Sequence, residues 1–284
     1  MTADRRLGII AGAGDLPVRL AAAAAAAGRD PFVVTLRGAA MPADFQPWPH
    51  AAVEMAQVGR VLSALRQAGC ADIVMAGRLQ RPSFSRLKPD WQGIRLLPRV
   101  VAAAREGDDA LLRALVRFFE DEGFRVVGAE EVLGDLLAPL GPLGRLEPGP
   151  EEWHDIGRAV QVVQALGALD VGQAAIVRDG LVLGVEAAEG TDALIERCRL
   201  LQTEGSGGVL VKLPKPGQER RVDLPTIGRA TVARAAAARL KGIALAAGGA
   251  LVLDRNDVAA AADVAGIFVC GIDLAAGVPG HEPP

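Results

Sequence analysis

The chain has 284 residues and a mass of 29.4 kDa, which is enough for about two domains. Half of the residues are hydrophobic and 23% are charged, which excludes wholesale disorder, and the net charge of −3 provides no basic field for nucleic acid. The three cysteines lie far apart without a CxxC pair, so we expect neither a disulfide framework nor a zinc knuckle. Scattered thiols of this kind are typical of a reducing, cytoplasmic location.

The first half of the chain alternates apolar strands with helical segments. Strands are expected at 7–10, 31–36, 73–76 and 124–127, and helices at 18–27, 58–68 and 108–122. Such a rhythm is typical of a parallel sheet with right-handed crossovers. We therefore expect an α/β fold that begins with a Rossmann-like domain over residues 1–137.

The segment 138–150 contains four prolines and three glycines, a composition that excludes a helix or a central strand. We interpret it as an interdomain linker, with a long surface loop inside one domain as the alternative.

The second half of the chain differs in kind, because it includes an antiparallel hairpin turning at Asp179-Gly180. Helices are expected at 153–166, 191–202, 231–241 and 254–264, and strands at 174–178, 181–186, 209–213, 243–247 and 250–253. These elements predict a C-terminal α+β domain with a mixed sheet over residues 151–273, followed by a tail at 274–284.

The first candidate site is a glycine loop between the first strand and the first helix. Gly12, Ala13, Gly14 and Asp15 stand where backbone N–H groups and a helix N-terminus can bind an anion. The pattern departs from GxGxxG, because Pro17 replaces the third glycine and Asp15 would oppose a pyrophosphate placed there. Tight-turn glycines without a ligand are the alternative interpretation.

Two further loops carry charge. Gly77 and Arg78 follow the third expected strand, and Arg78 with Arg81 could clamp a phosphate, although solvated loop arginines explain them equally well. Asp108 and Asp109 begin a helix, where capping of the helix is the simpler explanation for paired acids.

The densest set of candidates lies in the second half. Glu186, Glu189, Gly190, Thr191 and Asp192 meet at a strand-to-helix junction. Acids of this kind can hold a divalent cation, and Mg²⁺ needs only one or two carboxylates besides phosphate oxygens.

Cations follow within a few residues of these acids. Lys212, Lys215 and Arg221 lie in a segment stiffened by prolines, and Asp223 comes next. Cations that neutralise phosphates beside acids that hold a metal are the parts of a phosphoryl-transfer site. We expect Lys212, Lys215 and Asp223 to be catalytic, and Asp223, Asp192 and Glu189 to bind the metal. The residues expected to bind substrate are Gly12, Ala13, Gly14, Asp15, Gly77, Arg78, Glu186, Gly190, Thr191 and Arg221. A solvated charged loop is the alternative.

Four segments together resemble a known family. GIIAGAGDLP, AGRLQRP, GVEAAEGTDALIERC and VLVKLPKPGQERRVDLPTIG are similar, in this order, to segments of the I-type UDP-2,3-diacylglucosamine pyrophosphatases of lipid A biosynthesis, the LpxI family. The resemblance covers nearly the whole chain except the tail.

The resemblance implies two domains with a ligand cleft between them. It implies Mg²⁺-dependent hydrolysis of UDP-2,3-diacylglucosamine to UMP and 2,3-diacylglucosamine 1-phosphate (lipid X), with water attacking the phosphorus on the sugar side. It further implies that Asp223 is the family's catalytically important aspartate.

A lipid substrate for a chain without an expected membrane span suggests a cytoplasmic enzyme that is peripheral to the inner membrane and touches its inner leaflet. Apolar side chains considered for the acyl chains are Phe84, Trp91, Leu96 and Leu97. The sequence leaves the oligomeric state open, a homo-oligomer included.

Two rival functions remain open. An NAD(P)-linked oxidoreductase would use the glycine loop, yet residues 35–38 provide no acid to hold a ribose. A non-catalytic protein that binds a sugar nucleotide or a lipid is the other.

Overall fold

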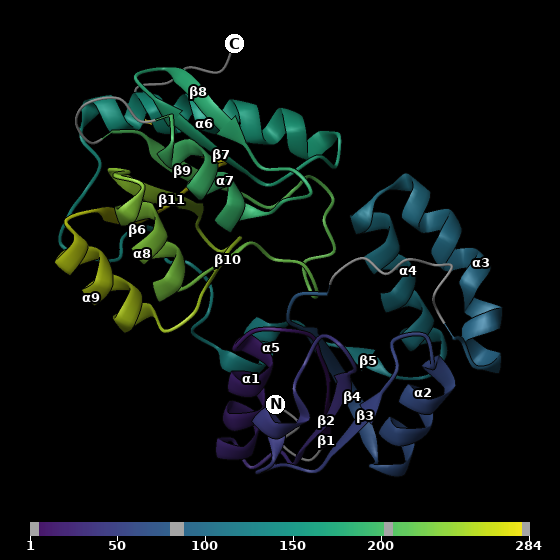
Figure 1. Cartoon of the computed structure of the whole chain (residues 1–284). Coiled ribbons are helices and arrows are strands. Elements are labelled where there is room, and N and C mark those ends of the chain that lie inside the picture. The colour runs from purple at the N-terminus through teal and green to yellow at the C-terminus, as the bar shows by residue number, and fades with distance from the viewer. Residues whose placement is uncertain (1–5, 80–87, 202–206, 280–284) are drawn as a thin grey trace. The chain divides into compact units, whose positions relative to one another are not determined.

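The computed structural model describes residues 6–79, 88–201 and 207–279, shown in colour in Figure 1. The chain divides into two units, and the division does not follow the sequence strictly. Unit 1 comprises Met1–Gly134 together with Glu219–Asp223, and unit 2 comprises Asp135–Gln218 and Leu224–Pro284.

Unit 1 contains a five-stranded parallel sheet in the order β3-β2-β1-β4-β5. Its strands are β1 (Arg6–Ala11), β2 (Pro31–Leu36), β3 (His50–Val53), β4 (Cys70–Ala76) and β5 (Arg125–Val126). The central strand β1 is almost entirely buried, as its apolar run predicts for a parallel strand covered on both faces. The expected parallel sheet is therefore present.

Helices cover both faces of this sheet (Figure 1). They are α1 (Leu16–Ala26), α2 (Val58–Gln67), α4 (Asp108–Asp121) and α5 (Ala129–Leu133), while α3 (Trp91–Glu106) packs outside them on α2 and α4. A 3₁₀ turn lies at Pro42–Phe45. Helix α1 packs with α5, whereas α2 directs Val61, Leu62 and Leu65 into the core that it shares with α4.

Unit 2 contains a six-stranded mixed sheet in the order β6-β13-β11-β9-β7-β8. Its strands are β6 (Gly141–Pro142), β7 (Ala174–Arg178), β8 (Leu181–Val185), β9 (Val209–Lys212), β11 (Gly242–Ala246) and β13 (Phe268–Ile272), and β10 (Thr226–Ile227) pairs separately with β12 (Leu251–Val252). Strands β9, β11 and β13 are parallel, while β6 and the hairpin β7–β8 supply the antiparallel pairs. The predicted mixed sheet is confirmed.

Two helical layers enclose this mixed sheet, as Figure 1 shows. Helix α6 (Pro150–Ala168) covers one face, and α7 (Thr191–Arg199), α8 (Arg229–Ala237) and α9 (Arg255–Ala265) cover the other. Each face has its own apolar core, because alternate residues of the strands point to opposite sides.

The segment expected to be a linker lies within unit 2. Ala138 is buried and donates its N–H to Ala250 O at 2.8 Å, and Gly141–Pro142 forms the edge strand β6 beside β13. Proline is tolerated there because an edge strand leaves part of its backbone unpaired. At the other end, Leu274 and Val278 of the expected tail pack against the core of unit 2.

Candidate functional site

Two glycine-containing loops meet at the carboxyl edge of the parallel sheet of unit 1. Gly12 N–H donates to Ala76 O at 2.8 Å, and Ala13 and Arg78 exchange backbone hydrogen bonds of 2.9 and 2.8 Å. A Cβ on Gly12 would lie 2.8 Å from the Gly77 backbone, and Gly77 has a φ of +93°. Only glycine allows this approach, so the loops after β1 and β4 form one structure.

This position is where the strand order reverses, with β2 and β3 on one side of β1 and β4 and β5 on the other. Open α/β sheets bind ligands outside the carboxyl ends of their strands at such a point. Gly14 and Asp15 at the start of α1, and Gly77 and Arg78 after β4, are all exposed there. The structure thus brings together the predicted glycine-loop residues and Arg78, while Arg81 falls outside the described residues.

Unit 2 places a second group of polar side chains at the carboxyl end of β9. Lys212 pairs in register with Ala174 of β7, and Ala174 O accepts a 2.8 Å hydrogen bond from Glu186 N–H just after β8. Residues opposite one another on antiparallel strands point to the same face. Lys212 and Glu186 therefore share the face of the sheet that α7 and α8 cover.

Glu186 is a buried carboxylate, with a relative exposure of 6%. Its Oε1 accepts a 2.6 Å hydrogen bond from Thr191 Oγ1, and its Oε2 accepts a 3.3 Å bond from Gln173 N–H. Gly190, at a φ of +82°, turns the chain so that Thr191 begins α7. The predicted trio of Glu186, Gly190 and Thr191 is thus a single fixed junction.

Lys212 is a buried cation at the end of a buried strand. Its exposure is 7%, and its Nζ donates to Thr226 O of β10 at 3.2 Å. A lysine taken out of water needs compensating partners. Lys212 therefore provides a positive charge whose position is determined by the sheet rather than by a mobile loop.

Lys215 has different surroundings. Its Nζ lies 2.5 Å from Asp170 Oδ1 in a largely buried ion pair, and its backbone N–H donates to Gln218 Oε1 at 2.8 Å. We expected this lysine to be catalytic, and in the structure its ion pair holds the loop after β9 to the end of α6.

The chain returns to unit 1 for the five residues Glu219–Asp223. Asp109 of α4, which is buried, accepts a 2.8 Å hydrogen bond from Glu219 N–H and forms a 3.0 Å ion pair with Arg113. Val222 packs against the apolar core of unit 1. The segment that carries Asp223 is therefore fastened to α4.

Arg221 is enclosed by two carboxylates. It makes two 2.8 Å hydrogen bonds to Glu219 and one of 2.6 Å to Glu120 of α4. The hydrogen bond from Arg221 lowers the pKa of Glu219, and the one to Glu219 is the main reason that the pKa of Arg221 is raised. We expected Arg221 to bind substrate, but here the two glutamates occupy its guanidinium.

Asp223 itself is half-buried at the end of this segment, and its N–H donates to Glu219 O at 3.1 Å. The sequence placed Asp223 in a C-terminal domain with the other acids. In the structure, the contacts of Asp223 group it with unit 1, whereas Glu189 and Asp192 lie in unit 2.

The three acids expected to bind a metal are divided between the two units, with Asp223 in unit 1 and Glu189 and Asp192 in unit 2. Across residues 6–79, 88–201 and 207–279, no three His, Cys, Asp or Glu side chains gather in a way that could hold a metal ion. Glu189 pairs with Arg197 at 2.8 Å, and Asp192 lies 3.7 Å from Arg234.

Several residues of these sites were missed or misjudged from the sequence. Asp109 looked like a helix-capping acid, Asp170 lay in no motif, and Thr226 lay in a motif but had no role assigned to it. Their roles depend on contacts between distant segments, such as the 110 positions that separate Asp109 from Glu219. The sequence did signal Asp109 indirectly, through paired acids at a helix start.

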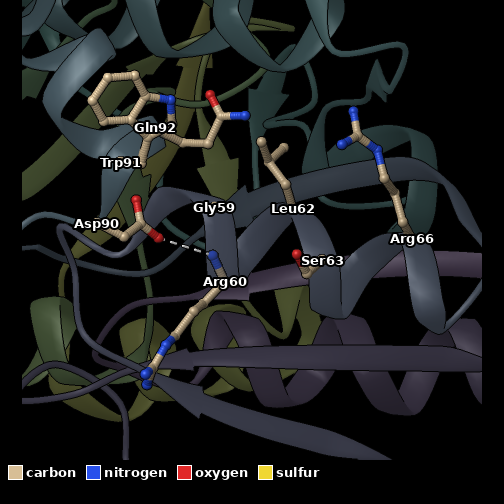
Figure 2. A pocket seen from close by; sticks show the side chains of 8 residues that line it. All are labelled: Gly59, Arg60, Leu62, Ser63, Arg66, Asp90, Trp91 and Gln92. Carbon is tan, nitrogen blue, oxygen red and sulfur yellow. Dashed lines mark hydrogen bonds between the residues drawn. The ribbon is translucent and has the colours of Figure 1, made fainter.

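A shallow pocket of about 270 Å³ lies elsewhere in unit 1, between α2 and the start of α3 (Figure 2). Arg60, Ser63, Arg66, Asp90 and Trp91 are among its lining residues, and none of the predicted site residues is. Of the side chains considered for the acyl chains, Leu96 is buried in helix packing, Trp91 is 71% exposed, and Phe84 lies outside the described residues.

No helix in the described part of the chain has the length and apolar character needed to cross a membrane.

Comparison with known proteins accounts for both units. Residues 6–136 match the LpxI N-terminal domain family, and residues 139–270 match the LpxI C-terminal domain family. A protein of Caulobacter vibrioides (strain ATCC 19089 / CIP 103742 / CB 15), named UDP-2,3-diacylglucosamine pyrophosphatase LpxI, is 50% identical over 275 residues, which are 95% of this chain and 98% of that protein. Because both domain families are present in order and the similarity spans nearly the full length, the chain belongs to the LpxI family.

Proposed function

We propose that this protein is an enzyme of lipid A biosynthesis that hydrolyses the pyrophosphate of UDP-2,3-diacylglucosamine. The products are UMP and 2,3-diacylglucosamine 1-phosphate. The observation that carries the proposal is the 50% identity, over nearly the whole chain, to a relative named for this activity. The polar edges of both units agree with a ligand that has a nucleotide and a diphosphate.

The reaction needs positive charge at the diphosphate and a positioned water. Water forms a bond to the phosphorus on the sugar side, the bond from that phosphorus to the bridging oxygen breaks, and the bridging oxygen departs with UMP. Lys212 and Lys215 would neutralise the diphosphate and the charge that develops on the departing UMP. Preorganised charge of this kind stabilises a transition state more than mobile solvent does.

Asp223 would orient the attacking water or contact a magnesium ion held by phosphate oxygens. Mg²⁺ supplies charge neutralisation at the phosphates, and a single protein carboxylate is compatible with its preference for substrate oxygens and water.

The other predicted residues would bind substrate. The glycine-loop residues, with Gly77 and Arg78, offer backbone N–H groups and a guanidinium at the switch point of unit 1. Glu186, Gly190 and Thr191 form the polar junction of unit 2. Arg221 would contact substrate only after leaving Glu120.

Because the substrate is a membrane lipid, we propose that the enzyme works in the cytoplasm at the inner leaflet of the inner membrane, as a peripheral protein.

Turnover of UDP-2,3-diacylglucosamine, with and without a chelator of Mg²⁺, tests the proposal. We expect UMP and the lipid phosphate in equal amounts, with loss of both when the cation is removed and recovery when it is restored. Binding of the substrate without turnover would instead indicate a sugar-nucleotide or lipid carrier. Saturable binding of NAD(P) without turnover would indicate the oxidoreductase.

A further inference from the structure

Helix α3 presents a continuous exposed face. At 100° per residue, one arc of the helix contains residues that are all exposed. They are Trp91, Ile94, Arg95, Pro98, Arg99, Ala102, Arg105 and Glu106. The opposite arc contains Gly93, Leu96 and Ala104, which are buried. The helix packs against α2 and α4, so two neighbouring helices support it.

The apolar part of this face is unusual for a surface. The Trp91 side chain is 71% exposed and the Ile94 side chain is 51% exposed. Tryptophan side chains are highly buried on average, because moving their large apolar ring out of water is favourable. Two large apolar side chains one turn apart on an exposed helix indicate a surface that contacts something apolar.

The polar part of the face is cationic. Arg95, Arg99 and Arg105 oppose one acid, Glu106, whereas the chain as a whole has a net charge of −3. Within the described part of the chain, no ion pair engages Arg95 or Arg99. Their guanidinium groups are therefore available to anions from outside the protein.

The tryptophan stands on a rigid support. Asp90 Oδ1 accepts the Gly93 N–H at 2.8 Å, and its Oδ2 accepts the Arg60 N–H at 3.1 Å, so one carboxylate caps α3 and ties it to the start of α2. Figure 2 shows the hydrogen bond between Asp90 and the Arg60 N–H beside the Trp91 ring at the shallow pocket. Holding Trp91 on a capped helix reduces the entropy lost on binding.

We infer that the exposed face of α3 docks onto an anionic phospholipid surface. Tryptophan favours the level of the lipid headgroups, and arginines on the same helix pair with lipid phosphates. A second copy of this chain is a poorer occupant, because two such faces would oppose arginine to arginine. The inference rests on the proposed function in taking a membrane lipid as the substrate, and its test requires no turnover.

The test measures co-sedimentation of the full-length protein with vesicles of phosphatidylcholine mixed with phosphatidylglycerol, and with vesicles of phosphatidylcholine alone. We expect binding to the anionic vesicles that weakens as salt is raised. Trp91→Ala should lower the partition coefficient on the order of tenfold. Arg95→Gln and Arg99→Gln should each lower it about fivefold, as expected for one charge near an anionic surface.

Two matched variants act as controls. Val264→Ser removes an apolar side chain that is 91% exposed on α9, and Arg158→Gln removes an exposed arginine on α6, so both should bind vesicles like the wild type. Equal loss of binding in the controls, or wild-type binding by the α3 variants, would overturn the inference. So would association of the protein with itself that is lost in Trp91→Ala while vesicles are not bound.

The two proposals fail in distinguishable ways. Vesicle binding by α3 without hydrolysis of UDP-2,3-diacylglucosamine would contradict the proposed hydrolysis and not the proposed membrane-docking face. Hydrolysis of detergent-dispersed substrate without vesicle binding would contradict the surface and not the function.

Discussion

Lys212 and Lys215 are three positions apart, yet their side chains are held by different parts of unit 2. Lys212 is fixed at the end of β9 against Thr226 O, and Lys215 is paired with Asp170. Sequence alone treated the two lysines as equivalent, because their partners come from segments 14 and 45 positions away.

Lys212→Ala should lower kcat/KM by about two orders of magnitude, equivalent to about 3 kcal/mol of transition-state stabilisation. Steady-state kinetics at neutral pH measures this loss. A change below about threefold would show that the buried cation does not face the reacting phosphates.

Lys215→Ala should lower both kcat/KM and the free energy of unfolding, because Asp170 is left as an unpaired, largely buried carboxylate. Adding Asp170→Asn should restore stability, measured by urea unfolding, without restoring turnover. Recovery of turnover in the double variant would give Lys215 a purely structural role.

Asp223→Ala should lower kcat on the order of a hundredfold or more while substrate still binds. Binding is measured by titration calorimetry and turnover by UMP release. Asp257→Ala, an acid in the first turn of α9, is the control and should retain wild-type turnover. A folded Asp223→Ala protein with near-normal kcat would refute the assignment.

The position of the segment Glu219–Asp223 depends on α4. Asp109→Ala leaves the Glu219 N–H without its acceptor, which costs about 1–3 kcal/mol locally. We expect kcat to fall on the order of tenfold with KM within about twofold, because Asp223 loses its position while substrate contacts remain. Asp121→Ala, on the exposed end of the same helix, should have no effect. An unchanged kcat in Asp109→Ala would show that α4 does not position Asp223 for the reaction.

The same segment should respond to acid. Since the hydrogen bond from Arg221 lowers the pKa of Glu219 below its ordinary 4.5, the ionised glutamate stabilises the folded segment. That contribution is complete above pH 4.5 and is lost as the pH falls through the lowered value. The protection factor of the Val222 amide, which is the intrinsic exchange rate divided by the observed rate at the same pH, should therefore fall in acid. In Glu219→Gln this protection factor should not change across the same pH range.

The strands and helices that sequence predicted best are those with uninterrupted apolar patterns, such as β1, β2 and α4. Helix α3 was missed because Gly93 and Pro98 interrupt its pattern, and its stability comes from the Asp90 cap and the contacts with α2 and α4. Strand β13 was missed because its short apolar run, Phe268–Ile272, lies directly before the segment that was expected to be a tail. The edge strand Gly141–Pro142 inside the expected linker was missed, because its pairing with β13 is tertiary.

The three cysteines are buried and are distributed over both units, with Cys70 in unit 1 and Cys198 and Cys270 in unit 2. Burial raises the pKa of Cys70, in unit 1, to about 11 against an opposing effect of Arg6, and raises that of Cys270, in unit 2, to about 12. Cys198 of unit 2 is also buried, and burial raises its pKa as well. The native thiols are therefore protonated and shielded at neutral pH.

We expect iodoacetamide to label these thiols only on unfolding, with Cys70 reporting on unit 1 and Cys270 on unit 2. Because the folded pKa values are raised, folding stability should fall as the pH rises above the ordinary thiol value of 9.0, by at most about 1.4 kcal/mol per pH unit for each group. Peptide mapping after labelling at increasing urea measures the first effect. Rapid labelling of the native protein at neutral pH would contradict the burial.

The most direct measurement is hydrolysis of UDP-2,3-diacylglucosamine in ¹⁸O-labelled water with Mg²⁺, followed by mass spectrometry of both products, for the wild type and for Asp223→Ala. We predict equal amounts of UMP and lipid phosphate from the wild type, with the label in the lipid phosphate and not in UMP, and on the order of a hundredfold less of both from the variant. No product from the folded wild type would contradict the proposed activity. Label in UMP would contradict attack on the sugar-side phosphorus.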